Sequence, residues 1–99
     1  SAVLSDDSYV TIDVLADFLM FHKNINIELT GHTDDMGDEE YNKSLSRRRA
    51  EAIRDALIER GVAYERISVN ACGSERPLFP NDSDRHRALN RRVEMRCCK

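Results

Sequence analysis

Apolar and polar residues alternate with two different periods along the chain, and these periods divide it into helices and strands. Apolar residues recur every three or four positions over 12–19, which predicts a first helix that begins after Ser5 as its N-cap and ends near Lys23. Strict alternation over 25–30 predicts a half-buried strand. A turn-rich segment over 31–37 ends this strand.

The second half of the chain shows the same two periods. A long helix is predicted over 38–60, and Gly61 is its expected stop. Alternating segments at 67–71 and 93–97 predict two further strands, and 84–89 fits one or two turns of helix between them. Amphipathic elements in this order predict an α+β two-layer sandwich, in which the helices cover one face of a mixed sheet.

Size and charge limit the classes of function. The chain has 99 residues, 40% hydrophobic and 33% charged, so we expect one domain over 1–99. Its net charge of −3 gives no strong attraction for nucleic acid or an anionic membrane. No apolar run reaches the roughly 18 residues of a membrane span, so direct membrane insertion is not expected. The abrupt start without a signal peptide is typical of a piece of a longer protein.

Cysteines and histidines do not form a metal-site pattern. Cys72, Cys97 and Cys98 are an odd set without CxxC spacing, which argues against a zinc site and a disulfide scaffold. We interpret them as small apolar side chains on strands, although a link from Cys72 to one of the adjacent pair stays open in an oxidising compartment. His32 has no second histidine at ligand spacing, so it should pack or hydrogen-bond in the turn. No metal or cofactor is therefore expected.

One arginine lies where the second helix should be apolar. One i, i+4 row, which we interpret as the buried stripe, consists of Tyr41, Leu45, Arg49, Ile53 and Leu57. A guanidinium cannot shed its charge, so something anionic should face Arg49. On the pattern alone an internal carboxylate is slightly favoured, and the alternative is a ligand carboxylate held as a bidentate pair.

An acidic loop precedes this helix. Asp34 and Asp35 follow the strand at 25–30, which is a common location for ligands in α/β sheets. A cleft with one fixed cation and one nearby anion is complementary to a zwitterion. A weak cation site on the two aspartates is the less favoured reading. The sequence has no Ser-His-Asp order and no Gly-rich phosphate loop that would support catalysis.

An ordered set of short motifs carries a family resemblance over nearly the whole chain. The motifs are Thr30-Gly31-His32-Thr33-Asp34 with Gly37, Tyr41-Asn42, Leu45-Ser46 with Arg49-Ala50, Gly61-Val62, Arg66-Ile67, Gly73-Ser74-Glu75-Arg76-Pro77 and Asn90-Arg91-Arg92-Val93-Glu94. Each motif alone is weak, but the ordered set resembles the OmpA-like C-terminal peptidoglycan-binding domain. The resemblance implies a βαβαββ fold with a mixed sheet.

The resemblance also implies a function and a set of site residues. Domains of this family are non-enzymatic and periplasmic, belong to outer-membrane or cell-envelope proteins, and bind peptidoglycan through the diaminopimelate of its stem peptide. By this likeness Asp34 would hold the ammonium group and Arg49 the carboxylate. The further positions implied are Asn42, Leu45 as an apolar wall, Arg91, and backbone groups around Thr33 and Met36. The parent protein could be porin-like, a lipoprotein or a motor stator.

The chain departs from the family pattern at its start. Residues 1–4 look like the tail of the family's first strand, so we expect that strand to be missing and the domain to be N-terminally truncated. The family's first strand should lie beside the closing strand, here about 92–98. Its loss would leave an unpaired edge and would favour self-association through that edge.

Two other classes of function compete with the anchor. A basic stretch that could bind nucleic-acid phosphates consists of Arg85, Arg87, Arg91, Arg92 and Arg96. No aromatic residue interleaves with these arginines, so stacking platforms are missing and no nucleic-acid partner is expected. The second alternative is a protein-interaction domain that kept the fold and lost the ligand, which would be indifferent to free diaminopimelate.

Overall fold

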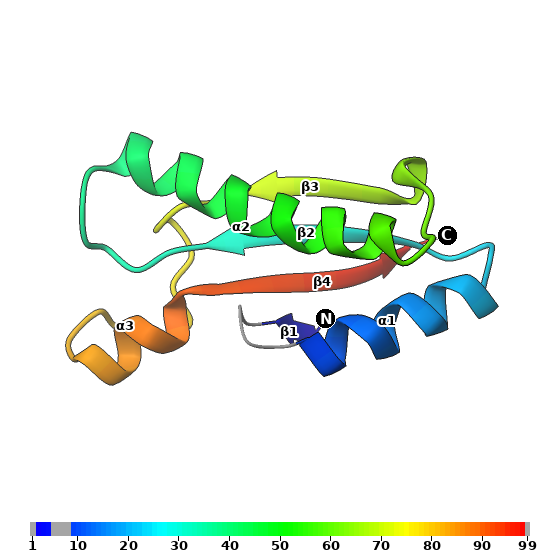
Figure 1. Ribbon diagram of the computed structural model, residues 1–99. Helices are drawn as coiled ribbons and strands as arrows, with labels where there is room; N and C mark the ends of the chain where they lie inside the picture. Colours follow the sequence, from blue (N-terminus) through cyan, green and yellow to red (C-terminus); the bar gives the residue numbers. More distant parts are fainter. Residues whose placement is uncertain (1, 5–8, 99) are drawn as a thin grey trace.

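Four strands form one mixed sheet in the order β1-β4-β2-β3 (Figure 1). The computed structural model describes residues 2–4 and 9–98. The strands are β1 (Ala2–Leu4), β2 (Asn26–His32), β3 (Ile67–Ala71) and β4 (Arg92–Cys98). β2 pairs in parallel with β3 and antiparallel with β4, and β1 pairs antiparallel with the outer edge of β4. The sheet is therefore mixed, as predicted.

Three α-helices connect these strands, and the predicted α+β class is confirmed. The helices are α1 (Tyr9–Phe21), α2 (Glu39–Glu59) and α3 (Asp84–Asn90), with a short 3-10 turn at Tyr64–Arg66. Asp38 caps α2 by accepting a hydrogen bond from the Tyr41 backbone N–H. The predicted cap of α1, Ser5, lies outside the described residues. Of the helices in the described ranges, none combines the length and apolarity needed to cross a membrane.

The core lies between the sheet and one layer of helices. Ile27 and Leu29 on β2 are almost completely buried, as is Val93 on β4, which is paired with Gly31 in the strand register. Leu19 from α1 and Leu57 from α2 belong to the same apolar cluster. Each such side chain contributes about 1.5–3 kcal/mol relative to an exposed one. The cluster therefore places α1 and α2 on the same face of the sheet (Figure 1).

The buried face of α2 differs from the predicted row in its first half. The buried residues are Asn42, Ser46, Ala50, Ile53 and Leu57. Tyr41 is 54% exposed, and Leu45 and Arg49 are only half-buried. The expected stripe was therefore wrong by one position at its start. The physical reason is that this half of α2 faces loop backbone, where small polar side chains fit and form hydrogen bonds.

The expectation that the first strand is missing was wrong. Ala2–Leu4 forms β1, and its residues pair with Met95, Glu94 and Val93 of β4. Three extended residues provide enough backbone to cover the first half of that edge. The prediction that the first strand lies beside the closing strand at 92–98 is confirmed.

Candidate functional site

The loops that follow β2 and β3 meet at one edge of the sheet. Because the two strands are parallel, both loops leave from the same edge, where α/β proteins commonly place ligands. The Cys72 N–H donates to the Gly31 carbonyl at 3.0 Å, and the Thr33 N–H donates to the Gly73 carbonyl at 2.8 Å. These two bonds extend the strand pairing into the loops and hold Thr33, which is 2% exposed, beside the second loop.

α2 is fastened to the same two loops through Ser46. Its hydroxyl accepts a hydrogen bond from the Gly73 N–H at 3.0 Å and donates to the Lys43 carbonyl at 2.8 Å. Ser46 is completely buried, and its backbone lies directly against the Cα of Gly31. The first half of α2 is thus fixed against the end of β2, which in turn fixes the loop between them.

Asp34 lies at the centre of that loop. Its carboxylate accepts hydrogen bonds from the Met36 N–H at 3.0 Å and from the Arg91 guanidinium at 2.7 Å. The Asn42 amide donates to the Asp34 carbonyl at 3.4 Å. The Asp34 side chain keeps 11% of its surface exposed. Since a carboxylate offers about four lone-pair sites, it can still accept a further donor from solvent or a ligand.

Arg91 reaches this loop from the other end of the chain. It follows α3, and the buried side chain of Asn90 holds that end of α3 in place. The Asn90 amide oxygen accepts from the N–H groups of Leu78 and Phe79, and its NH₂ group donates to the Phe79 carbonyl and to Asn81. A second ion pair, Arg87 with Asp35 at 3.4 Å, also joins α3 to the loop after β2.

The remaining predicted site residues lie further along α2. Leu45 and Arg49 are one turn apart, so they lie on the same side of the helix, and both are half-buried. Arg49 is two turns beyond Asn42, about 10 Å along the helix axis. Hydrogen bonds therefore link Thr33, Asp34, Met36, Asn42 and Arg91 into one cluster. Arg49 and Leu45 lie on the helix that bounds this cluster, and their roles stay predictions.

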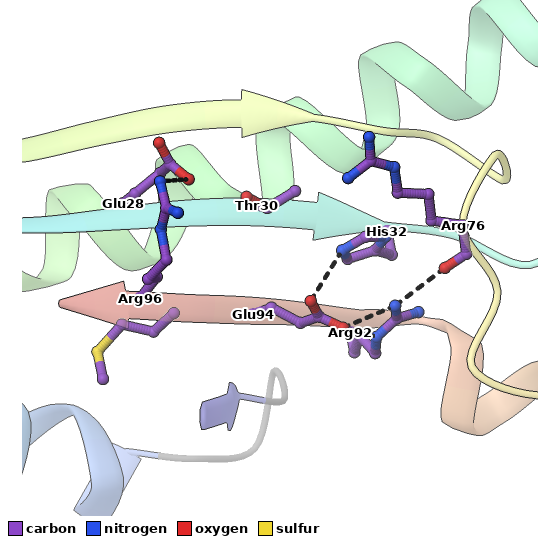
Figure 2. Close-up of a pocket in the computed structure, with 8 residues that line it drawn as sticks. Glu28, Thr30, His32, Arg76, Arg92, Glu94 and Arg96 are labelled. Carbon is purple, nitrogen blue, oxygen red and sulfur yellow. Dashed lines mark hydrogen bonds and ion pairs between the residues drawn. The ribbon is translucent and has the colours of Figure 1, made fainter. Parts of the chain in front are cut away.

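A separate pocket of about 460 Å³ lies on the open face of the sheet, opposite the helices (Figure 2). It is lined by Glu28, Thr30, His32, Arg76, Arg92, Glu94, Met95 and Arg96. None of the predicted ligand residues lines it. The sequence held a signal for it, because polar residues alternate with apolar ones on both β2 and β4, and the strand register places these polar residues on one face.

His32 is the most enclosed polar residue of this pocket. It lies in β2 rather than in a turn, is 2% exposed, and its Nε2 is 3.7 Å from a carboxylate oxygen of Glu94. Neither ring nitrogen has a hydrogen-bond partner among the described residues. Burial lowers the pKa of His32 from its usual 6.5, and the positive charge of Arg92 lowers it further. His32 therefore packs, which is one of the two alternatives expected for it, although it does so on a strand rather than in a turn.

The other candidate features are a metal site, the cysteines and the basic stretch. Within residues 2–4 and 9–98, no three His, Cys, Asp or Glu side chains are grouped to hold a metal ion. All three cysteines are free thiols. Four arginines of the basic stretch pair with carboxylates, namely Arg87 with Asp35, Arg91 with Asp34, Arg92 with Glu94 and Arg96 with Glu28. These pairs neutralise most of the charge that a nucleic-acid interface would need.

Curated relatives share most of this chain. It is 41% identical over 93 residues to outer membrane porin F of Pseudomonas fluorescens, covering 94% of this chain and 28% of the porin. It is 37% identical over 93 residues to the peptidoglycan-associated lipoprotein of Brucella melitensis, covering 94% of this chain and 55% of the lipoprotein. The chain thus spans between about a quarter and just over half of these relatives.

Solved structures and a family model agree with these relatives. The peptidoglycan-associated lipoprotein of Burkholderia pseudomallei superimposes with a TM-score of 0.90 at 30% identity, covering 96% of this chain and 80% of that chain. The C-terminal domain of Helicobacter pylori MotB superimposes with a TM-score of 0.85 at 30% identity, covering 97% of this chain and 75% of that chain. The model of the OmpA family matches residues 1–91. This chain belongs to the OmpA family.

Proposed function

We propose that this domain binds peptidoglycan non-covalently through the diaminopimelate of the stem peptide, and that it anchors an outer-membrane or cell-envelope protein to the cell wall. Relatives that are named peptidoglycan-associated lipoproteins and outer membrane porins support peptidoglycan as the partner and the cell envelope as the location. The observation that supports diaminopimelate as the recognised group is the Asp34 carboxylate, which is enclosed by Arg91, Met36 and Asn42 but still partly exposed.

Asp34 provides the anionic half of the site. The free centre of diaminopimelate bears an ammonium and a carboxylate on one carbon, so its receptor needs an anion and a cation close together. The Asp34 carboxylate is held in one orientation by a backbone N–H and a guanidinium. An ammonium group that approaches its exposed part would add a charge-assisted hydrogen bond without a loop rearrangement.

Arg49 provides the cationic half. A guanidinium binds a carboxylate with two parallel N–H···O bonds, and its position on a helix fixes the direction of this fork. Leu45, one turn earlier, would form the apolar wall, and Asn42 and Arg91 would close the end near Asp34. Backbone groups around Thr33 and Met36 would complete the rim.

Residues 1–99 would belong to one peptidoglycan-binding domain, in the periplasm, and would work without catalysis. The relatives are named as porins and lipoproteins, which supports a structural role. The chain spans only part of the length of these relatives. The tethering of a longer parent protein, and any other activity of that parent, is therefore proposed as well.

We also propose that the domain self-associates through the edge of the sheet, over a shorter stretch of β4 than the sequence suggested. β1 covers β4 only at Val93–Met95, so the stretch from Arg96 to Cys98 has no described strand on its outer side. A second copy of the chain could pair with this short stretch, as unpaired strand edges do.

The proposed ligand contacts are tested by co-sedimentation with purified sacculi. We expect Asp34→Asn and Arg49→Lys to lose most of the binding, because truncating one partner of a hydrogen-bonded charge pair typically costs about 2–5 kcal/mol. The matched controls are Asp35→Asn and Arg48→Lys, which make the same changes at exposed neighbouring positions. Soluble diaminopimelate should compete for the wild-type protein, whereas Nα-acetyl-lysine amide, whose side-chain ammonium has no carboxylate on the same carbon, should not.

Three results would contradict the proposal. The first is unchanged sedimentation of both site variants. The second is equal loss in the site variants and in their controls, since that would indicate a general charge effect. The third is sedimentation that soluble diaminopimelate does not reduce, which would keep peptidoglycan as the partner and reject diaminopimelate as the recognised group. Circular dichroism of each variant separates lost binding from lost folding.

A further inference from the structure

The pocket on the open face of the sheet does not belong to the proposed diaminopimelate site. Its lining comes from polar residues that alternate along β2 and β4, from Met95, and from Arg76 in the loop after β3, whereas Asp34 and Arg49 lie at the sheet edge and on α2. Its volume of about 460 Å³ falls in the range of small-molecule sites. The proposed diaminopimelate site therefore does not account for this pocket.

The charges around this pocket do not balance. Glu94 is paired with Arg92 at 2.7 Å, and Glu28 is paired with Arg96 at 3.2 Å, so both carboxylates are neutralised within the sheet. Arg92 also donates to the carbonyls of Asn90 and Arg76, so its guanidinium is already engaged by three residues. Arg76 is the remaining arginine, and its guanidinium has no ion pair or hydrogen bond with the described residues. One positive charge is left over in the pocket.

A second observation points to a ligand rather than to a balanced structural network. His32 lines the pocket beside Arg76 and is 2% exposed. Its Nε2 is 3.7 Å from a carboxylate oxygen of Glu94 (Figure 2), yet neither ring nitrogen has a hydrogen-bond partner among the residues described. Buried polar groups in native proteins are nearly always hydrogen-bonded, so a pair of unpartnered ring nitrogens at a pocket wall indicates a missing polar partner. A ligand oxygen would supply this partner.

We propose that this pocket binds the carboxylate of a small organic monoanion, with Arg76 as its cation and the His32 ring as its second donor. A carboxylate matches the planar fork of a guanidinium. A single negative charge balances the single unpaired arginine, whereas a dianion such as phosphate would bring an uncompensated charge close to Glu94 and Glu28. Thr30 and Met95, which also line the pocket, would contact the body of the ligand.

Binding should take up a proton at the histidine. The charged groups that act on His32 are Arg92 and Glu94 from β4 and Arg76 from the loop after β3. Burial and the two arginines keep the pKa of His32 low in the free protein. A bound carboxylate would raise that pKa, because a nearby negative charge favours the imidazolium. The affinity should therefore increase as the pH falls below neutrality.

The proposal is tested by titrating ¹⁵N-labelled protein with propionate, N-acetylalanine, and N-acetylalanine amide as the uncharged control. We expect saturable shifts at Thr30, His32, Arg76 and Glu94 with the two acids and none with the amide. Arg76→Gln should weaken binding at least about tenfold, as expected for loss of a charge-assisted pair worth more than 1.4 kcal/mol. Arg85→Gln, the same change at an exposed arginine outside the pocket, should leave it unchanged.

The probes also identify the source of the carboxylate. Similar affinities for the two acids indicate a free small acid, and clear preference for N-acetylalanine indicates the C-terminus of a peptide; both outcomes support the site. The absence of saturable shifts at these residues, or equal binding by wild type and Arg76→Gln, would overturn it. Since Arg76 is exposed, its variant should fold even if a His32 variant does not. Asp34→Asn should bind propionate normally, so this site and the proposed wall contact can fail independently.

Discussion

The backbone carbonyl oxygen of Ser46 occupies the place of a side chain at position 31. A Cβ built on Gly31 would lie 1.9 Å from this oxygen and 2.6 Å from its carbonyl carbon. No real Cβ tolerates such a separation, so α2 touches β2 at this point because residue 31 is glycine. The contact sets the depth of α2 against the sheet, and with it the position of the loop that carries Asp34.

Replacing Gly31 by alanine should strongly destabilise the domain. The obstacle is helix backbone rather than a flexible side chain, so α2 must shift as a whole and lose contacts with the sheet. We expect a loss of about 3 kcal/mol or more in the free energy of unfolding, at the upper end of overpacking effects. Urea unfolding followed by circular dichroism measures it.

Gly37→Ala is the matched control for this prediction. Gly37 has a φ of 88° but open space around its Cα, since the nearest side-chain atoms would be 3.6 Å from a new Cβ. Its substitution should cost only the backbone strain, about 1–2 kcal/mol. If Gly31→Ala were as mild as Gly37→Ala, close approach of α2 to β2 would not be what requires glycine at position 31.

Asn90→Ala should loosen the loop after β3. The Asn90 amide is fully buried and makes four hydrogen bonds to Leu78, Phe79 and Asn81. Each loop group left without a partner costs about 1–3 kcal/mol if it stays buried, and relaxation into solvent recovers part of this. We expect a net loss of about 2–4 kcal/mol in denaturant unfolding. Asn70→Ala, at an exposed position on β3, should change stability by less than about 0.5 kcal/mol.

The same variant should weaken the proposed ligand site without touching it. Arg91 is placed next to Asp34 by the end of α3, which Asn90 fixes. In sacculus binding, Asn90→Ala should therefore fall between wild type and Asp34→Asn under conditions where it is folded. Wild-type binding by a folded Asn90→Ala protein would contradict the role of Asn90 in placing Arg91.

The α2 stripe shows where periodicity predicts structure and where it does not. In the second half of the helix, Ile53 and Leu57 are buried as the apolar pattern predicted. In the first half, Asn42 and Ser46 are buried instead of Tyr41 and Leu45, because they hydrogen-bond to loop backbone. Hydropathy patterns register apolar burial and cannot register a polar residue buried for its hydrogen bonds.

Sequence patterns also could not predict the contacts between distant parts of the chain. The ion pair between Arg91 and Asp34 joins residues 57 positions apart, and no periodicity relates them. Family resemblance assigned both residues to one site, but only the fold shows that they contact each other. The open-face pocket was missed because the polar residues of each strand were interpreted as solvent-facing, one strand at a time.

Stability should depend on pH through His32. Its pKa is lowered by folding from the usual 6.5, so between pH 6.5 and this lower value the unfolded chain binds more protons than the folded one. The free energy of unfolding should therefore decrease as the pH falls through that window, by at most about 1.4 kcal/mol for each pH unit, and this loss should level off below the folded-state pKa. Unfolding in denaturant over a pH series measures the slope.

Matched histidine variants identify the group that causes this pH dependence of the free energy of unfolding. His32→Gln should remove it, whereas His22→Gln, at the end of α1 and away from the pocket, should keep it. The carboxyl of Asp82, whose pKa is lowered chiefly by its hydrogen bond from His86, contributes in a different window. Its stabilisation is lost only as the pH falls below its usual 3.8. A slope near pH 6 that survives in His32→Gln would assign the effect to another group.

Deleting residues 1–4 should increase the self-association of the domain. β1 supplies the partner for Val93–Met95, and its loss would leave the whole outer edge of β4 open. The free energy of unfolding should fall by about 2 kcal/mol, as expected for losing a few strand hydrogen bonds. Sedimentation velocity from micromolar to millimolar concentration measures the association.

Cysteine oxidation could imitate this result, because Cys97 is exposed on the same edge and Cys98 is half-buried beside it. The experiment therefore uses a background in which Cys72, Cys97 and Cys98 are serine. We expect that background to bind sacculi like wild type, since no cysteine is among the proposed ligand residues. In it, the deletion should increase association, and a lysine in place of Cys97 should reduce it by placing a charge on the edge. If the deletion variant is strictly monomeric at millimolar concentration, pairing through the β4 edge is excluded, and β1 serves only the stability of the sheet.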